Sequence, residues 1–214
     1  AMGGVVVIDT LRKWPGLKEI TPEEAKRNRC QSALFASTNP TWVGVAFCAG
    51  VDHMISMASF STYVTLGSTA TTLEARDKDR SKQRGVSFRI RVCEWDPEAE
   101  RVGTVLFEGE ELLVLEREWR MFDLNMEGHV DVEGRAHLML CLSTEGCVRY
   151  THGAAWVAAL GLPDERGARR GEKAPEPPPE MSGGMWVLAG ELSGANARFV
   201  RQEEVMACKI SYTS

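Results

Sequence analysis

Three carboxylates lie within four residues of one another in the stretch 105–122 (VLFEGEELLVLEREWRMF). Glu108, Glu110 and Glu111 stand directly before the apolar run 112–115. A carboxylate followed at once by a buried strand is held by the sheet, which is how a site places one charge accurately. The same pattern is typical of a hairpin that keeps its turn in water. Both interpretations, an acidic lip of a site and a solvated turn, stay open from the sequence.

The elements that must position these carboxylates are mostly strands. Apolar and polar residues alternate over 55–66 and over 86–92, which predicts a strand in each stretch. Residues 41–50 are apolar throughout and are consistent with either a strand or a short buried helix. The turn residues Glu133-Gly134 predict that the stretches 122–130 and 136–142 form a hairpin. Further strands are predicted at 5–11, 33–35, 122–130, 136–142, 185–191 and 199–211, the last of which we expect to dock back onto the main sheet.

Helices are expected chiefly in the N-terminal half. The tetrapeptide TPEE at 21–24 supplies an N-cap hydroxyl, a proline at the first helical position and acidic residues in the first turn, which predicts a helix to about residue 31. A second helix is predicted over 68–78, and the alanine-rich stretch 150–160 predicts a third. Strands with a few helices indicate an α+β fold whose core is a sandwich of two packed sheet layers.

Composition excludes several classes of function. The chain has 214 residues, 43% of them hydrophobic and 26% charged, which is typical of a globular protein. A net charge of −5 speaks against general nucleic-acid binding and against binding to an anionic membrane. Its apolar runs are too short and too often interrupted for a transmembrane helix.

The six cysteines show no CxxC pair and no Cys/His spacing of a zinc site, so no metal site is predicted. Most of them lie in apolar, strand-like surroundings. Buried free thiols are therefore expected, which indicates a reducing intracellular compartment. The cysteines are Cys30, Cys48, Cys93, Cys141, Cys147 and Cys208.

Three segments carry a resemblance to a known family. The first is SFST at 59–62, the second is GVSFRI at 85–90, and the third is EELL at 110–113, followed by RMF at 120–122. In this order they resemble the Ser-Thr-Ser strand, the GxxFxI strand and the Glu-x-Glu turn with its closing strand in the mono-ADP-ribosyltransferases. The similarity is to the arginine-specific and clostridial-toxin branch and covers about residues 30–143.

The resemblance implies NAD as cofactor and an ADP-ribosyltransferase-like core. Cleavage of the bond between nicotinamide and ribose builds positive charge on the ribose, which a fixed carboxylate stabilises in a partly dehydrated site. On the family pattern Glu111 would hold the ribose hydroxyl, with Glu110 and Glu108 beside it as further catalytic candidates. The reaction would be ADP-ribosyl transfer or hydrolysis of NAD.

The resemblance also implies which residues bind the cofactor. Ser61 and Thr62, with Phe60 beside them, would form the pocket wall. The family's phosphate-gripping arginine is missing, since Ala36 stands at that position. Arg89 is the candidate for that grip, and the sequence leaves open whether it or Arg91 has taken over the role.

Two departures weaken the match and open a second hypothesis. Gly109 stands two residues before Glu111, where the family has Glu or Gln, and Tyr63 replaces a small hydroxyl residue. The alternative function is therefore a catalytically inactive protein-interaction module on a β-rich scaffold. It would use the acidic lip or the charged and proline-rich stretch 163–184, which is expected to form an exposed loop.

Domain organisation follows from that stretch. We expect an ADP-ribosyltransferase-like core at residues 1–146. Residues 147–214 would form a C-terminal extension that contains the proline-rich loop and strands docking back onto the core. The sequence predicts a protein partner and leaves the oligomeric state open.

Overall fold

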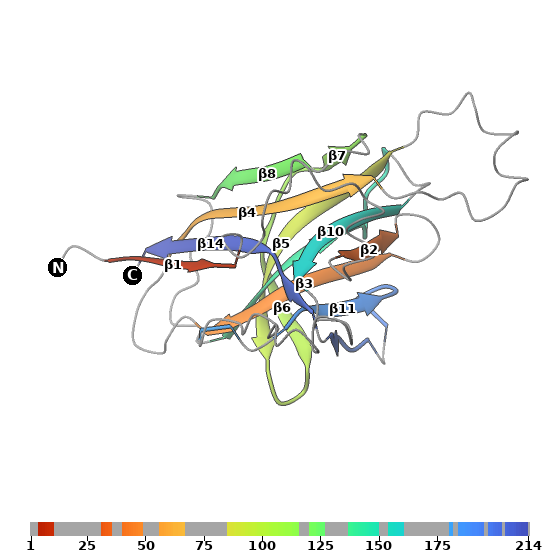
Figure 1. Cartoon of the computed structure of the whole chain (residues 1–214). Helices are drawn as coiled ribbons and strands as arrows, with labels where there is room; N and C mark the ends of the chain where they lie inside the picture. The colour runs from red at the N-terminus through yellow and green to blue at the C-terminus, as the bar shows by residue number, and fades with distance from the viewer. Residues whose placement is uncertain are drawn as a thin grey trace, which may run out of the picture.

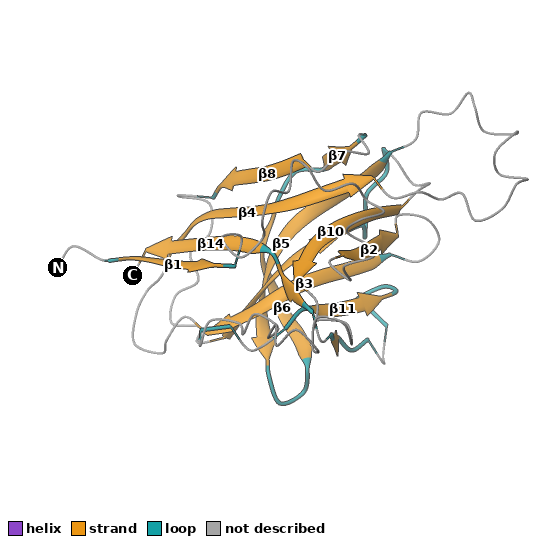
Figure 2. Cartoon of the chain, in the orientation of Figure 1, coloured by secondary structure: helices purple, strands orange, loops and turns teal. Residues whose placement is uncertain are grey.

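Two antiparallel sheets of seven strands each make up the part of the chain that the structure describes (Figures 1 and 2). The structure is a computed structural model, and no helix occurs among the residues it describes. These are residues 4–10, 31–35, 40–48, 56–66, 85–115, 120–126, 137–149, 154–160, 180–181, 184–194, 197–202 and 204–213.

The first sheet, called sheet I, joins the two ends of the described chain. Its strands in spatial order are β1 (Val5–Asp9), β14 (Cys208–Thr213), β4 (Ser56–Leu66), β10 (Ala154–Leu160) and β13 (Val205–Met206), while β2 (Gln31–Phe35) pairs with β10 and β8 (Arg120–Asn125) with β4.

The second sheet, called sheet II, holds the residues that surround the acidic stretch. Its strands in spatial order are β12 (Val200–Arg201), β11 (Trp186–Ala189), β3 (Thr41–Cys48), β9 (His137–Ser143), β5 (Val86–Asp96) and β6 (Arg101–Glu108), while β7 (Leu112–Val114) pairs with β5.

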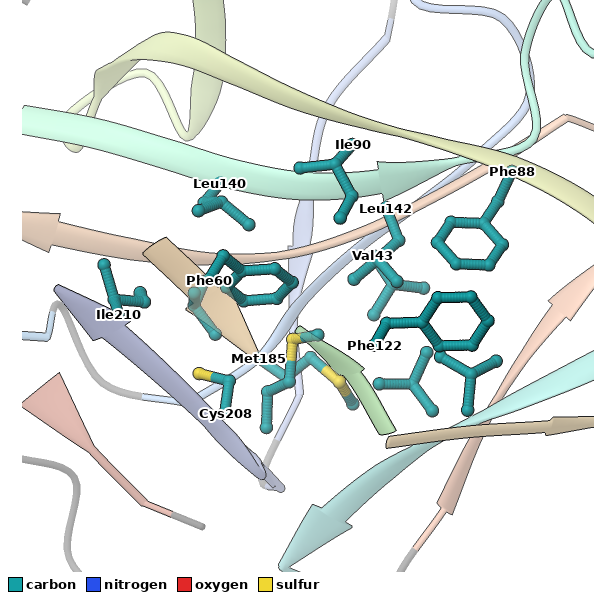
Figure 3. Close-up of a cluster of buried hydrophobic side chains, with 14 of the residues drawn as sticks. Val43, Phe60, Phe88, Ile90, Phe122, Leu140, Leu142, Met185, Cys208 and Ile210 are labelled. Carbon is teal, nitrogen blue, oxygen red and sulfur yellow. The ribbon is translucent and has the colours of Figure 1, made fainter. Parts of the chain in front are cut away.

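An inter-sheet core of apolar side chains lies between the sheets (Figure 3). Because side chains alternate along a strand, every second residue of β4 and β5 points into it. Phe60 is supplied by β4, Phe88 and Ile90 by β5, and all three are fully buried. Phe122 of β8 meets Phe88 edge-on, with ring centroids 5.2 Å apart. The alternation seen in the sequence is therefore the pattern that closes the sandwich.

A second apolar group, called here the outer-face cluster, lies on the other side of sheet II. Leu192 and Phe199 pack on it from the chain after β11. The rings of Trp95 and Trp186 lie 4.9 Å apart within it. Sheet II is thus buried on both faces, which explains the nearly continuous burial along β3, β5 and β9. The buried members are Trp42, Ala46, Cys93, Trp95, Met139, Cys141, Trp186, Leu188 and Phe199.

The predicted α+β class is wrong, because the described part of the chain is all-β. The two-layer layout fits the prediction, whereas the predicted helix over 150–160 is the strand β10. Its alanines favour a helix in isolation, but β10 lies between β4 and β2 and makes ladder bonds to both. The small side chains of Ala155 and Ala158, both fully buried, suit a strand packed in the middle of a sheet.

The predicted hairpin of 122–130 with 136–142 is also wrong. β8 pairs with β4 in sheet I, and β9 pairs with β3 and β5 in sheet II, so the two strands lie in different layers. The apolar residues of β9 are buried on both faces, which a central strand satisfies and a hairpin arm does not. The region 41–50, left open between strand and helix, contains the strand β3.

Other predictions lie outside the described residues. These are the helices at 21–31 and 68–78, the position of Ala36, the turn at 133–134 and nearly all of the proline-rich stretch 163–184. Strands that follow residue 147 stand inside both sheets: β10 and β14 flank β4, and β11 pairs with β3. The strand β14 pairs with β4 in sheet I.

Candidate functional site

The three carboxylates lie where one edge of sheet II changes partner. β6 pairs with the second half of β5, β7 pairs with its first half, and the chain crosses between them at Gly109. The amide of Gly109 donates to the carbonyl oxygen of Ile90 at 2.8 Å. A Cβ at Gly109 would stand 3.3 Å from that oxygen and 3.5 Å from the Phe107 ring, so the close approach favours glycine. This crossing sends the three side chains in different directions.

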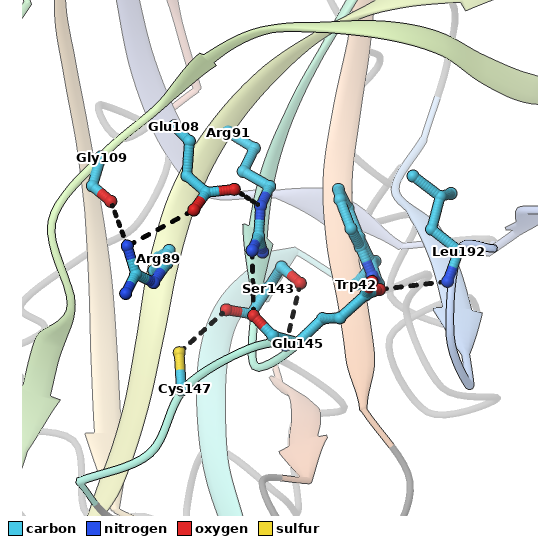
Figure 4. A network of polar contacts seen from close by, with 9 residues as sticks. All are labelled: Trp42, Arg89, Arg91, Glu108, Gly109, Ser143, Glu145, Cys147 and Leu192. Atoms are coloured by element: carbon cyan, nitrogen blue, oxygen red, sulfur yellow. Dashed lines mark hydrogen bonds and ion pairs between the residues drawn. The ribbon is translucent and has the colours of Figure 1, made fainter.

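Glu108 turns to the outer face of sheet II and holds two arginines (Figure 4). Its carboxylate accepts from Arg91 Nε at 2.8 Å and pairs with Arg89 Nη1 at 3.4 Å. Arg89 Nη1 also donates to the carbonyl of Gly109 at 3.3 Å. Arg89, expected to grip a cofactor phosphate, is instead engaged by Glu108.

Arg91 connects the acidic stretch to the outer-face cluster (Figure 4). It is 6% exposed, its Nη2 donates to the carbonyl of Glu145 at 2.9 Å, and its guanidinium carbon lies 4.8 Å from the centre of the Trp42 ring. Glu145 Oε2 in turn accepts from Trp42 Nε1 at 2.6 Å and from the amide of Leu192 at 3.0 Å. This network fastens the segment after β11 over the cluster.

Glu111 is used to hold the chain that follows β9. Its Oε1 accepts from the backbone amides of Val148 at 3.2 Å and Arg149 at 2.9 Å. Partial burial acts to raise the pKa of Glu111, but these two bonds, a hydrogen bond with Ser87 and the charge of Arg149 lower it overall. Burial raises the pKa of the nearby Cys147 thiol, and the charge of Glu111 adds to that effect. Glu111 therefore acts as an ionised clamp.

Glu110 borders a cavity together with Glu108 and Gly109. The cavity, of about 430 Å³, lies between the crossing at Gly109 and the end of β8. Glu110 is exposed, and within the described residues no hydrogen bond or ion pair engages its carboxylate. The walls are apolar apart from the rim, and the lining residues are Ile90, Phe107, Glu108, Gly109, Glu110, Leu112, Leu124, Asn125 and Met126.

A second hollow, of about 440 Å³, lies where β5 and β6 meet their turn. Its carboxylates already have partners: Glu94 accepts from the amide of Thr104 at 3.2 Å, and Asp96 accepts from the amides of Glu98 and Ala99. The cavity beside Glu110 differs because it combines apolar walls with a carboxylate that is free to bind.

The structure separates the residues expected to bind NAD. Phe60 lies in the inter-sheet core, and Thr62 is buried and donates to the carbonyl of Ala207 at 3.0 Å. Ser61 faces the other way along β4 and donates to Asp123 at 2.7 Å. Glu111 bonds Ser87, which points to the outer side of sheet II. Ser61 and Glu111 therefore lie on opposite outer sides of the sandwich and share no cleft.

Sequence reasoning missed Glu145 and the cavity wall at Leu124 and Met126. Both depend on segments far apart in the sequence, so no local pattern marked them. A usable signal did exist in the period-two alternation from Ser87 to Trp95, which places Arg91 on one face with the cysteine and tryptophan that follow.

Comparisons with protein-family models, with curated proteins and with solved structures gave no significant match. No described segment forms a helix of the length and apolar character needed to cross a membrane.

Proposed function

We propose that this chain is a non-catalytic β-sandwich module that recognises a protein partner through the cavity beside Glu110. The observation that carries this proposal is a cavity of about 430 Å³ with apolar walls and, at its rim, the carboxylate of Glu110, which no described residue engages. Cavities of this size and lining are typical of sites that bind a ligand.

Charge defines one part of the ligand. Glu108 is committed to Arg89 and Arg91, and Glu111 to the amides of Val148 and Arg149. Glu110 is left to meet a positive group, so a lysine or arginine side chain is the matching chemistry. The apolar wall beside it accepts an aliphatic or aromatic side chain from the same ligand.

The neighbouring strand favours a peptide over a small molecule. β8 pairs with β4, and within the described residues no strand occupies its other edge. An open strand edge offers backbone amides and carbonyls to an extended peptide, whose alternate side chains can then enter a neighbouring pocket. The end of β8, at Leu124 and Asn125, forms part of the cavity wall. The ligand is therefore an extended segment with an apolar residue near a basic one.

The test is selection of short peptides from a random library on the purified chain, followed by titration of the best binder. Glu110→Gln should weaken binding about fivefold, since an exposed ion pair contributes about 1 kcal/mol. Leu124→Ser should weaken it further by removing apolar wall. Glu98→Gln, an exposed carboxylate on the β5–β6 turn, is the matched control and should bind as the parent does.

Two outcomes would overturn the proposal. One is that the selected peptides bind Glu110→Gln and Leu124→Ser as tightly as they bind the parent protein. The other is saturable heat on titration with NAD that Glu111→Ala abolishes, which would favour ADP-ribosyl chemistry. That activity stays a prediction, and the separation of Ser61 from Glu111 gives it no support.

A further inference from the structure

We propose that the outer-face cluster contains a binding site for a soft monovalent metal ion, Cu(I), formed by Cys93, Cys141 and Met139. This site is independent of the cavity beside Glu110. It rests on three sulfur atoms that two adjacent strands bring to one face of sheet II.

Strand register places these sulfurs together. Along β5 and β9, Arg91 pairs with Cys141 and Cys93 pairs with Met139, so the four residues form two neighbouring cross-strand pairs. All four point to the outer side, because Ile90, Leu140 and Leu142 point into the inter-sheet core. Cys93 and Cys141 are therefore diagonal neighbours on the outer side of two adjacent strands. Two buried thiols in this arrangement are the starting point for a two-thiolate metal site.

Gly44 on the neighbouring strand β3 makes room for the third sulfur. It pairs with Cys141, and a Cβ at this position would lie 2.8 Å from Met139 Sδ and 2.9 Å from Cys141 Sγ. Any side chain there would displace both sulfur atoms. The glycine thus lets a thioether and a thiol share the space above β3.

Donor chemistry selects the ion. Thiolate and thioether ligands favour Cu(I), whereas Zn²⁺ in closed sites takes four ligands from Cys, His and carboxylates. Among the described residues no group of three or more His, Cys, Asp and Glu side chains could hold a metal. Two thiols and a thioether in apolar surroundings therefore fit an ion that accepts few, soft ligands.

Arg91 places a positive group beside the proposed complex. Binding converts two thiols to thiolates, so one Cu(I) enters and two protons leave to solvent, with no change in oxidation state. The copper with two thiolates carries one negative charge, and the buried Arg91, whose Nε pairs with Glu108, lies opposite Cys141. Arg91 Nη1 is buried without a hydrogen-bond partner in the described part of the chain, so it is available to face that negative charge.

Binding of copper depends on pH. The thiolate, and not the thiol, is the metal ligand, so copper must displace two protons and its affinity should rise with pH. All three sulfur residues are fully buried in the outer-face cluster, so binding requires the cluster to open to the ion.

The test is an anaerobic titration of the full chain with Cu(I) against a chromophoric Cu(I) chelator. The parent protein has Cys30, Cys48 and Cys147 changed to serine. Its remaining thiols are Cys93 and Cys141 of the proposed site and Cys208. One Cu(I) should bind per chain with release of two protons. Cys93→Ala and Cys141→Ala should each weaken Cu(I) binding by more than about 100-fold. Loss of a residue that only supports a metal ligand already costs about 10–100-fold, and a ligand should cost more.

Two further variants make the result specific. Met139→Leu keeps volume and removes only sulfur, and should weaken binding about tenfold. Cys208→Ala removes an equally buried thiol on sheet I and should bind like the parent. Loss of binding in Cys208→Ala, unchanged binding in both alanine variants, or no binding in the parent would overturn the proposal.

X-ray absorption of the copper-loaded parent removes any dependence on how well the alanine variants fold. A first coordination shell made only of sulfur, reduced by one scatterer in Met139→Leu, supports the site. Nitrogen or oxygen scatterers in the parent overturn it.

Discussion

The inter-sheet core and the outer-face cluster are both nearly dry, yet they are built from different side chains. Valine, leucine, isoleucine and phenylalanine dominate the core, whereas the cluster holds three tryptophans, two cysteines and a neighbouring arginine. The indole nitrogens of Trp95 and Trp186 are buried without hydrogen-bond partners in the described part of the chain. Buried polar groups without partners oppose folding. The inter-sheet core thus favours stability of the fold, whereas the outer-face cluster contains polar groups that lower stability and that can bind a ligand.

The largest expected effect tests the core side of this comparison. Phe88→Ala removes a fully buried ring that packs edge-on against Phe122, and should lower the free energy of unfolding by about 3–5 kcal/mol. Urea denaturation measures it, with Val200→Ala, a 61% exposed position, as the control. A loss below about 1 kcal/mol would mean that the two sheets do not depend on this contact.

An intermediate effect tests the network beside the cluster. Glu108→Gln leaves the buried Arg91 guanidinium without its carboxylate, and should cost about 1–3 kcal/mol of unfolding free energy. Arg91→Met replaces the buried cation by an apolar chain and leaves Glu108 free to hydrate, so it should change stability by about 1 kcal/mol or less. Urea unfolding of both variants gives the order. The reverse order would show that Arg91 stabilises the fold by its own contacts.

The smallest effect concerns pH. The pKa of Glu111 in the folded protein lies below its usual value, so its hydrogen bonds add stability above that usual value, and this stability is lost as pH falls through the lower folded value. Glu111→Gln should therefore show a shallower decline of melting temperature on acidification. Because Glu111 is only slightly buried, the difference will be modest. Parallel curves for the two proteins between pH 6 and 3 would contradict this role of Glu111.

Much of the sheet structure could be predicted from the sequence, for a physical reason. Side chains of β4 and β5 alternate between the core and the other face, so the sequence shows a repeat of two residues in each strand. β10 could not be predicted, because alanines carry no strand preference and only the ladders to β4 and β2 make it a strand. The hairpin error has the same origin, since pairing partners are chosen by the whole sandwich.

The candidate site divides in the same way. The clustering of carboxylates pointed to the crossing at Gly109. Their spacing could not show that Glu108 pairs with arginine and Glu111 with backbone amides, while no described residue engages the Glu110 carboxylate. That distinction depends on Arg91 and on the backbone after β9. Cys93 and Cys141 were expected as buried thiols, but only strand register shows that they lie in neighbouring cross-strand pairs on one face.

The pairing of β1 with β14 sets the order in which this protein can be completed. Val5 lies opposite Thr213, and β14 also supplies the partner for Ser56–Thr62 of β4. During synthesis β1 and β4 therefore lack this partner until β14 has emerged from the ribosome. Such distant pairings fold slowly, and exposed edges invite association with other chains. Residues 208–213 thus protect β1 and β4 from association with other chains once they are in place.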